Sequence, residues 1–127
     1  MNDNARKWVD ALRSGEYSQT TGRLRRNVAN RYCYCCLGVA CELYRQETGE
    51  AFWDRGEYFT NTDLAYHDAS STRLVEPVQE WLGLRTHTGL FEGREGRDHL
   101  ANLNDRGTSF EEIAALIESE PQGLFAR

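Results

Sequence analysis

Apolar side chains recur at spacings of three and four near the start of the chain, which is the pattern of a helix with one buried face. The stripe begins after Asn4, whose side chain can cap a helix, and it stops before Gly15, a residue suited to a helix end. We expect this helix to pack on the core through its tryptophan. The apolar residues of the stripe are Ala5, Trp8, Val9 and Leu12.

A second stretch with helical spacing runs from Cys36 to Gln46 and stops at Thr48-Gly49. Its apolar positions are dense, so we expect it to be the central buried helix. Gly38 has two interpretations: it packs against a neighbouring helix, or it lets another backbone or a ligand phosphate approach the helix N-terminus closely. The apolar positions of this helix are Leu37, Ala40, Cys41 and Tyr44.

Two further helices are indicated in the second half of the chain. Pro77 and Gly83 bracket a short helix from Glu76 to Leu82. A capping box that begins at Ser109 opens a helix that continues to Ser119. The buried faces that we expect are Val78, Trp81 and Leu82 in the first helix, and Phe110, Ile113, Ala114 and Ile117 in the second.

The remaining segments favour short strands and turns. Polar, β-tolerant residues predict strands at Tyr17–Gln19 and Arg31–Tyr34 around a bend at Gly22, as a hairpin or as an irregular loop. A second hairpin is indicated around Arg55-Gly56, with strands at Ala51–Trp53 and Tyr58–Thr60. The loops that we expect are a glycine-rich segment at Thr86–Gly96 and a helix end and turn at Asn102–Gly107.

These elements predict an α+β fold, a compact single domain of about four helices with one or two short β-hairpins, over residues 1–127. The chain is 39% hydrophobic and 11% aromatic, which is enough apolar material for one core. No internal repeat or interdomain linker interrupts it.

The cellular location of the protein determines whether its cysteines are reduced. No apolar run is long enough to span a membrane, and the first residues lack a secretion signal, so we expect a cytoplasmic protein with reduced thiols and no membrane partner. We then expect the cysteines to be buried apolar residues. Three alternatives stay open: a disulfide, a metal cluster, and a catalytic thiol. The thiol would be Cys35 or Cys36, with His67, His87 or His99 as its base. The four cysteines are Cys33, Cys35, Cys36 and Cys41.

The distribution of charge indicates a basic surface on an acidic protein. The net charge is −5 and the isoelectric point is near 5.2, which disfavours DNA, RNA and anionic membranes as partners. The stretch from Tyr17 to Cys41 nevertheless contains no Asp or Glu. A second basic segment lies around His87 and His99 and is a candidate anion-binding loop. We predict one ligand-binding pocket, lined by Arg23, Arg25, Arg26, Arg31, Tyr34, Arg94 and Arg97.

Five segments of the chain share a pattern with known proteins. They are Lys7–Val9 with Gly15–Tyr17, Tyr34–Leu43, Glu80–Leu84 and Leu103–Phe110. Together they resemble a family of small bacteriophage and actinobacterial proteins, and the similarity covers nearly the whole chain. The resemblance implies an origin in a phage or prophage and supplies no catalytic residues. Small acidic phage proteins of this kind often counter host defence, and one recurrent mode is to sequester a nucleotide-derived immune signal.

We therefore expect a phage-encoded anti-defence protein that binds a small anionic nucleotide-derived signal, of the cyclic ADP-ribose or cyclic dinucleotide type, without turnover in the host bacterial cytoplasm. Guanidinium groups suit the phosphates and aromatic faces suit the base. We expect no catalytic residue, metal or cofactor. Two alternatives stay open: a protein–protein inhibitor whose arginine face docks on a host enzyme, and a hydrolase of such a signal that uses a thiol or histidine. Assembly into a homo-oligomer is also open.

Overall fold

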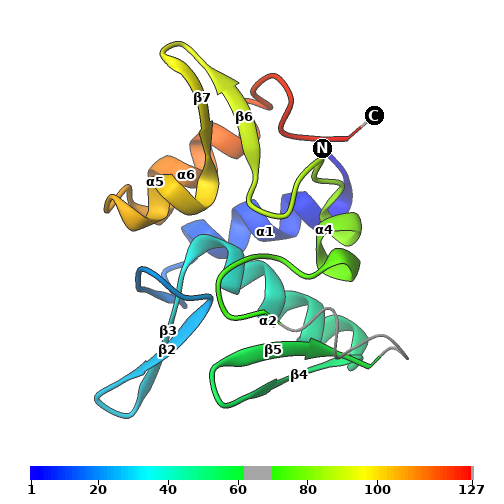
Figure 1. Cartoon of the computed structure of the whole chain (residues 1–127), viewed down its shortest axis with the longest axis vertical. Helices are drawn as coiled ribbons and strands as arrows, with labels where there is room; N and C mark the ends of the chain where they lie inside the picture. The colour runs from blue at the N-terminus through cyan, green and yellow to red at the C-terminus, as the bar shows by residue number, and fades with distance from the viewer. Residues whose placement is uncertain (62–69, 127) are drawn as a thin grey trace.

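Helices occupy both halves of the chain in the computed structural model, which describes residues 1–61 and 70–126 (Figure 1). The α+β class predicted from the sequence is confirmed. Five helices lie in the described ranges, one more than the sequence pattern indicates, because a short helix forms where we expected only a helix end and turn. They are α1 (Asp3–Arg13), α2 (Cys36–Thr48), α4 (Glu76–Leu82), α5 (Leu100–Asp105) and α6 (Phe110–Glu118).

The strands form three antiparallel hairpins in the described part of the chain. The hairpin at Ala51–Thr60 was predicted, whereas the last one lies mostly inside the expected glycine-rich loop at Thr86–Gly96. Its turn is closed by Gly96, which has a φ of 108°. The strands are β1 (Ser18–Gln19), β2 (Arg25–Val28), β3 (Arg31–Tyr34), β4 (Ala51–Asp54), β5 (Glu57–Thr60), β6 (Leu90–Gly93) and β7 (Gly96–His99).

The sheet around β3 differs from the arrangement that the sequence suggests. The predicted strand at Tyr17–Gln19 corresponds to β1, but it pairs with β3 in parallel and is not its hairpin partner. That partner is β2, which pairs antiparallel with β3 and places Arg25 opposite Tyr34. Because β2 is almost entirely polar, it has no apolar alternation from which its pairing could be recognised.

Helix α2 is the centre of the core, as expected from its dense apolar positions. Figure 1 shows α1, α4 and the β4–β5 hairpin arranged around it. Trp8 of α1 is fully buried and its indole N–H donates to the Cys36 carbonyl at 2.8 Å, while the Tyr58 hydroxyl donates to the Cys41 carbonyl at 2.6 Å. These bonds join α1 and β5 to opposite ends of the buried part of α2.

The ends of the other helices agree with the sequence in most details. Ser109 caps α6 by accepting the Glu112 N–H, and Gly83 ends α4 in the left-handed region. Helix α1 begins earlier than predicted: Asn2 is its cap, and Asn4 donates instead to the Trp81 carbonyl of α4. Trp81 itself is half-buried rather than part of the core, and its ring packs edge-on against Tyr44.

Gly38 lies against backbone, which decides between its two interpretations. A Cβ at this position would lie 1.8 Å from the carbonyl oxygen of Leu24, so no other residue fits without moving the chain. The close contact is with the residue that precedes β2 and not with a neighbouring helix. Since the Leu24 carbonyl also accepts the Cys35 N–H at 3.1 Å, this contact fixes the base of the β2–β3 hairpin onto α2.

Asn104 completes the enclosure of the α2 N-terminus. Its side chain is fully buried; its oxygen accepts the Cys36 N–H at 3.1 Å and the Gln19 amide at 2.8 Å, and its amide donates to the Thr20 carbonyl at 2.8 Å. The segment expected to be only a turn therefore connects three parts of the fold. It also closes the helix N-terminus, so of the two close approaches that Gly38 could allow, the structure shows that of another backbone.

We expect Asn104→Ala to lower the free energy of unfolding by about 3 kcal/mol, because it leaves the buried Cys36 N–H and Thr20 carbonyl without partners. Chemical denaturation measures this change. Asn27→Ala, at an exposed position of β2, is the matched control and should stay within about 0.5 kcal/mol of the wild type. A loss below about 1 kcal/mol for Asn104→Ala would contradict the role assigned to this side chain.

Candidate functional site

The β2–β3 hairpin extends from one end of the molecule (Figure 1). Every residue from 26 to 32 is exposed, whereas Leu24 and Tyr34 at its base are buried. Its two-residue turn is Ala29-Asn30, with φ values of 52° and 66°, which is the turn type that matches the twist of two antiparallel strands. The hairpin is therefore fixed at its base and surrounded by solvent at its tip.

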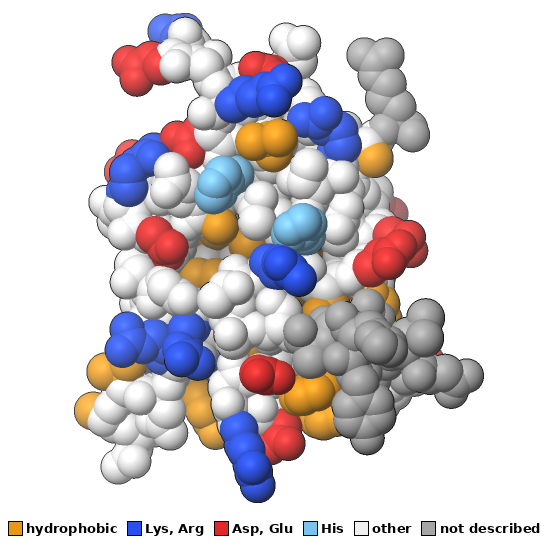
Figure 2. Space-filling model, in the orientation of Figure 1, with side chains coloured by type: hydrophobic (Ala, Val, Ile, Leu, Met, Phe, Trp, Pro, Cys, Tyr) orange, Lys and Arg blue, Asp and Glu red, His pale blue; other side chains and the backbone are white. Residues whose placement is uncertain are grey.

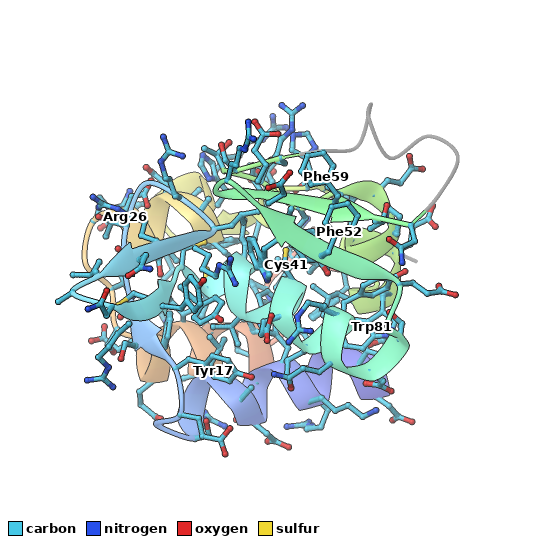
Figure 3. All side chains as sticks on the ribbon, turned by 90° about the horizontal axis from the view of Figure 1, so that it is seen from below. Tyr17, Arg26, Cys41, Phe52, Phe59 and Trp81 are labelled. Atoms are coloured by element: carbon cyan, nitrogen blue, oxygen red, sulfur yellow. The ribbon has the colours of Figure 1, made fainter. Side chains whose placement is uncertain are left out.

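Arginines lie on both faces of this hairpin. The register places Arg25 opposite Tyr34 on one face, and Arg26 opposite Cys33 on the other. Arg31 shares the face of Arg26, because it pairs with Val28 two positions further along. Figure 3 shows Arg26 at the margin of the molecule, pointing away from the core. The fourth arginine, Arg23, precedes β2, and its Nη1 lies 3.5 Å from the position that a Cβ would take at Gly56.

Arg25 is held between two aromatic rings. Its guanidinium carbon lies 3.8 Å from the ring centre of Tyr32 and 4.5 Å from that of Trp53. A cation over aromatic faces is attracted by the ring quadrupole, so both contacts restrict the side chain. The edge of the guanidinium carries its N–H donors, and no carboxylate of the described residues lies within 4.0 Å of them.

The buried carboxylate of Glu42 fixes the position of the Trp53 ring. The Trp53 indole N–H donates to Glu42 at 3.0 Å, and the same carboxylate accepts two bonds from Arg45 and one from Gln46. Burial raises the pKa of Glu42, but the hydrogen bonds from Arg45, Trp53 and Gln46 outweigh it, so the net shift of the pKa is downward. Glu42 therefore stays charged and orients the ring on which Arg25 rests.

Tyr34 does not present its ring to solvent. The side chain is only 8% exposed and packs edge-on against Tyr17 and Trp53. Burial is the main cause that raises its pKa, which is typical of a core tyrosine. Tyr32, which is 53% exposed, takes the place on the hairpin that the sequence analysis assigned to Tyr34.

The arginines of the hairpin have no acidic partner in the described residues. Ion pairs within 4.0 Å occupy most arginines of the helices and of β7, but none involves the β2–β3 hairpin or Arg23. Figure 2 shows Lys and Arg side chains gathered over this hairpin at the lower left. The acid-free stretch of sequence thus forms a hairpin whose arginines make no ion pair with the described residues. Its arginines are Arg23, Arg25, Arg26 and Arg31.

Arg94 and Arg97 lie elsewhere, so the predicted single pocket is not formed. They belong to the β6–β7 hairpin, which Figure 1 places at the opposite end of the long axis from β2–β3. The helices α1 and α2 lie between the two hairpins, which prevents the two groups of arginines from converging. The correction has a simple physical reason: sequence shows where charge is dense along the chain, and it does not show toward which side each hairpin points.

The β6–β7 hairpin borders a groove of about 660 Å³ against α5 and α6. Arg94, Arg97 and Arg106 line it, with the acids Glu95 and Asp98. Arg106 was not among the predicted site residues. It joins the groove because α5 directly follows β7 and turns back along it, where it forms an ion pair with Asp98 at 2.7 Å.

Thiol catalysis is contradicted by the positions of the cysteines. Cys35, Cys36 and Cys41 are buried and free, as expected for apolar core residues, while Cys33 is half-buried. Burial raises the pKa of Cys35 to about 11 and that of Cys36 well above its usual value, which is the opposite of an activated thiolate. Figure 3 shows Cys41 in the interior. The Sγ of Cys35 instead accepts the Gly38 N–H at 3.3 Å and caps α2.

Neither of the two histidines in the described residues forms a hydrogen bond with these thiols. His87 is exposed, and the Nδ1 of His99 accepts the Asn102 N–H at 3.2 Å, which caps α5. The remaining histidine, His67, lies outside the described residues. Within residues 1–61 and 70–126, no group of three or more His, Cys, Asp or Glu side chains could hold a metal ion.

Comparison with known proteins gives a family for the chain. Residues 1–121 match the family model described as a domain of unknown function, DUF8296. The chain belongs to this family. No curated protein and no solved structure matches the chain of this DUF8296 member. Of the helices described in the structure, none is both long and apolar enough to cross a membrane.

The pKa of Asp98 can be measured and reports on an ion pair that lines the groove. The hydrogen bond from Arg106 is the main cause that lowers its pKa to about 2, with further bonds from Asn102 and the His99 N–H. A lowered pKa means that the ion pair is fully formed above the usual value of 3.8 and is lost as the pH falls through about 2. We expect an NMR titration of the Asp98 carboxyl carbon to have its midpoint near this lower value.

The variant Arg106→Gln should raise the pKa of Asp98 part of the way toward its ordinary value, because the bonds from Asn102 and His99 remain. Arg94→Gln is the matched control, since Arg94 makes no ion pair with Asp98 and its loss should leave the titration unchanged. An unshifted Asp98 pKa in the wild-type protein would show that the pair with Arg106 does not persist in solution.

Proposed function

We propose that this DUF8296 protein is a non-enzymatic binding protein that inserts its β2–β3 hairpin into an acidic groove of a partner protein. The observation that supports the proposal is the set of arginines at 23, 25, 26 and 31, which have no carboxylate within 4.0 Å among the described residues of an acidic protein. Charges left without partners on a surface are available for a complementary surface.

The two-faced distribution of arginines favours insertion over flat docking. Arg25 extends from one face, and Arg26 and Arg31 extend from the other, so only a partner that contacts both sides of the hairpin uses all three. Val28 lies on the face of Arg26 and Tyr32 on the face of Arg25, and the two residues are 47% and 53% exposed. Arginine and tyrosine are the residues enriched where protein interfaces concentrate their binding energy.

A protein partner fits this surface better than a nucleic acid or a small ligand. The net charge of −5 repels DNA and RNA at long range, while a local acidic groove interacts with the hairpin alone. Small ligands are usually bound in concave pockets, and an exposed hairpin tip has a convex surface. The nucleotide-sequestering function expected from the sequence would therefore need another site.

The resemblance to bacteriophage proteins suggests the biological setting of this proposal. A phage protein that occupies an acidic groove of a host enzyme would block that groove without any chemistry of its own. Anti-defence activity would then result from inhibition of a host protein, which was the second of the functions expected from the sequence. The buried cysteines are consistent with a protein that acts by binding.

Affinity capture tests the proposal. Immobilised wild-type protein should retain an acidic protein from a lysate of the bacterium that carries the sequence, and salt should release it because exposed charges are screened. The double variant Arg26→Glu/Arg31→Glu should retain at least roughly tenfold less of it, since both arginines of one face become repulsive. Both residues are exposed and make no described ion pair, so the variant should fold.

Arg94→Glu is the matched control, because it changes an exposed arginine at the opposite end of the molecule by the same charge. It should retain the partner as the wild type does. Equal retention by the double variant would show that the hairpin is not the docking surface. Recovery of nuclease-sensitive material alone would contradict a protein partner, and recovery of nothing from any lysate fraction would contradict the proposal as a whole.

A further inference from the structure

The floor of the groove at the β6–β7 end is apolar and comes from three separate elements. Phe91 belongs to β6, Leu103 to α5 and Leu116 to α6. The volume of about 660 Å³ falls in the range typical of small-molecule sites, in which an apolar lining surrounds a few polar groups. Because three elements supply the floor, the tertiary fold forms this groove, and no single turn could.

The rim carries guanidinium groups that the fold already orients. Arg97 Nε donates to Glu92 at 3.0 Å, and Arg106 Nη2 donates to Asp98 at 2.7 Å. Each of these pairs uses part of a five-donor group, so further donors remain on both guanidiniums. Arg94, at the hairpin turn, forms no ion pair with any residue in the described ranges.

One guanidinium at the groove has no ion-pair partner among the described residues. Three arginines and two carboxylates line the groove, and Glu92 beside it pairs with Arg97, so the charges sum to zero; Arg97 and Arg106 are paired, whereas Arg94 is not. Asp98 keeps its negative charge across neutral pH because its pKa is low. A ligand with one oxyanion would pair with Arg94, whereas a neutral apolar molecule would leave Arg94 without a partner.

We propose that this groove is a binding site for a small organic monoanion that joins one oxyanion head to an apolar or flat aromatic body. The head lies at Arg94, with donors from Arg97 and Arg106 beside it. The body covers Phe91, Leu103 and Leu116. Two classes of molecule have this chemistry: carboxylates with a hydrocarbon body, and cyclic nucleotides, whose single phosphodiester carries one charge.

The test is an NMR titration of the uniformly ¹⁵N-labelled full chain with 3-phenylpropionate and, separately, with 3′,5′-cyclic AMP at millimolar concentration. At least one probe should shift the amide signals of β6–β7 and of Leu103 and Leu116. Arg94→Ala should weaken that binding about tenfold, because a charge-assisted contact is lost. Arg55→Ala, an exposed arginine in the β4–β5 turn, should bind as the wild type does.

The two titrations together identify the head group of the ligand. Shifts with phenylpropionate alone assign a carboxylate ligand, shifts with cyclic AMP alone assign a phosphodiester, and shifts with both assign the oxyanion as the shared determinant. The hairpin variant Arg26→Glu/Arg31→Glu should bind either probe normally, so this result is independent of the docking function. Absence of groove shifts with both probes, or binding unchanged by Arg94→Ala, overturns the proposal.

Discussion

The closed N-terminus of α2 is the constraint on which the rest of this structure depends. The first N–H groups of a helix have no partners within the helix, and here they lie inside the core. Asn104 and the sulfur of Cys35 accept the bonds of Cys36 and Gly38, and the Leu24 carbonyl lies directly against Gly38. Because these contacts join α5, α2 and the base of the β2–β3 hairpin, they orient the hairpin whose arginines make no ion pair with the described residues.

The same constraint divides the molecule into two ends with different binding properties. At one end, the hairpin has a buried base and an exposed tip, so its surface is convex and basic. At the other end, α5, which contains Asn104, directly follows β7, and the β6–β7 hairpin and the helices α5 and α6 border an open groove lined by charges of both signs. A convex basic surface suits a macromolecular groove, whereas a concave site of this volume suits a small ligand. We therefore assign different partners to the two ends.

Local signals in the sequence were sufficient for most helices and for one hairpin. The capping box at Ser109 and the helix stop at Gly83 depend on neighbouring residues only, so both could be predicted. Strand β2 could not, because Arg25 to Val28 form a strand only through pairing with β3. Helix α5 was missed for a similar reason: its cap is the His99 side chain, and its buried Asn104 is satisfied by partners more than 60 residues away.

The sequence predicted the basic surface of the candidate site but not which arginines lie together. An acid-free stretch of sequence indicates a basic surface, and within residues 1–61 and 70–126 no ion pair at Arg25, Arg26 or Arg31 offsets that charge. Convergence with Arg94 and Arg97 could not be judged, because it depends on the directions of two hairpins that α1 and α2 separate. Tyr34 and Tyr32 illustrate the same limit: both lie on the Arg25 face of the hairpin, but Tyr34 is at its buried base and Tyr32 is nearer its exposed tip.

Hydrogen–deuterium exchange of the protein in complex with the partner that it retains tests the central claim most directly. We expect backbone amides from Arg25 to Tyr34 to gain protection, including those at the tip, which solvent reaches in the free protein. Amides of β6 and β7 should exchange at the same rate in both states. Protection confined to β6–β7, with the β2–β3 hairpin still exchanging freely in the complex, would contradict the account.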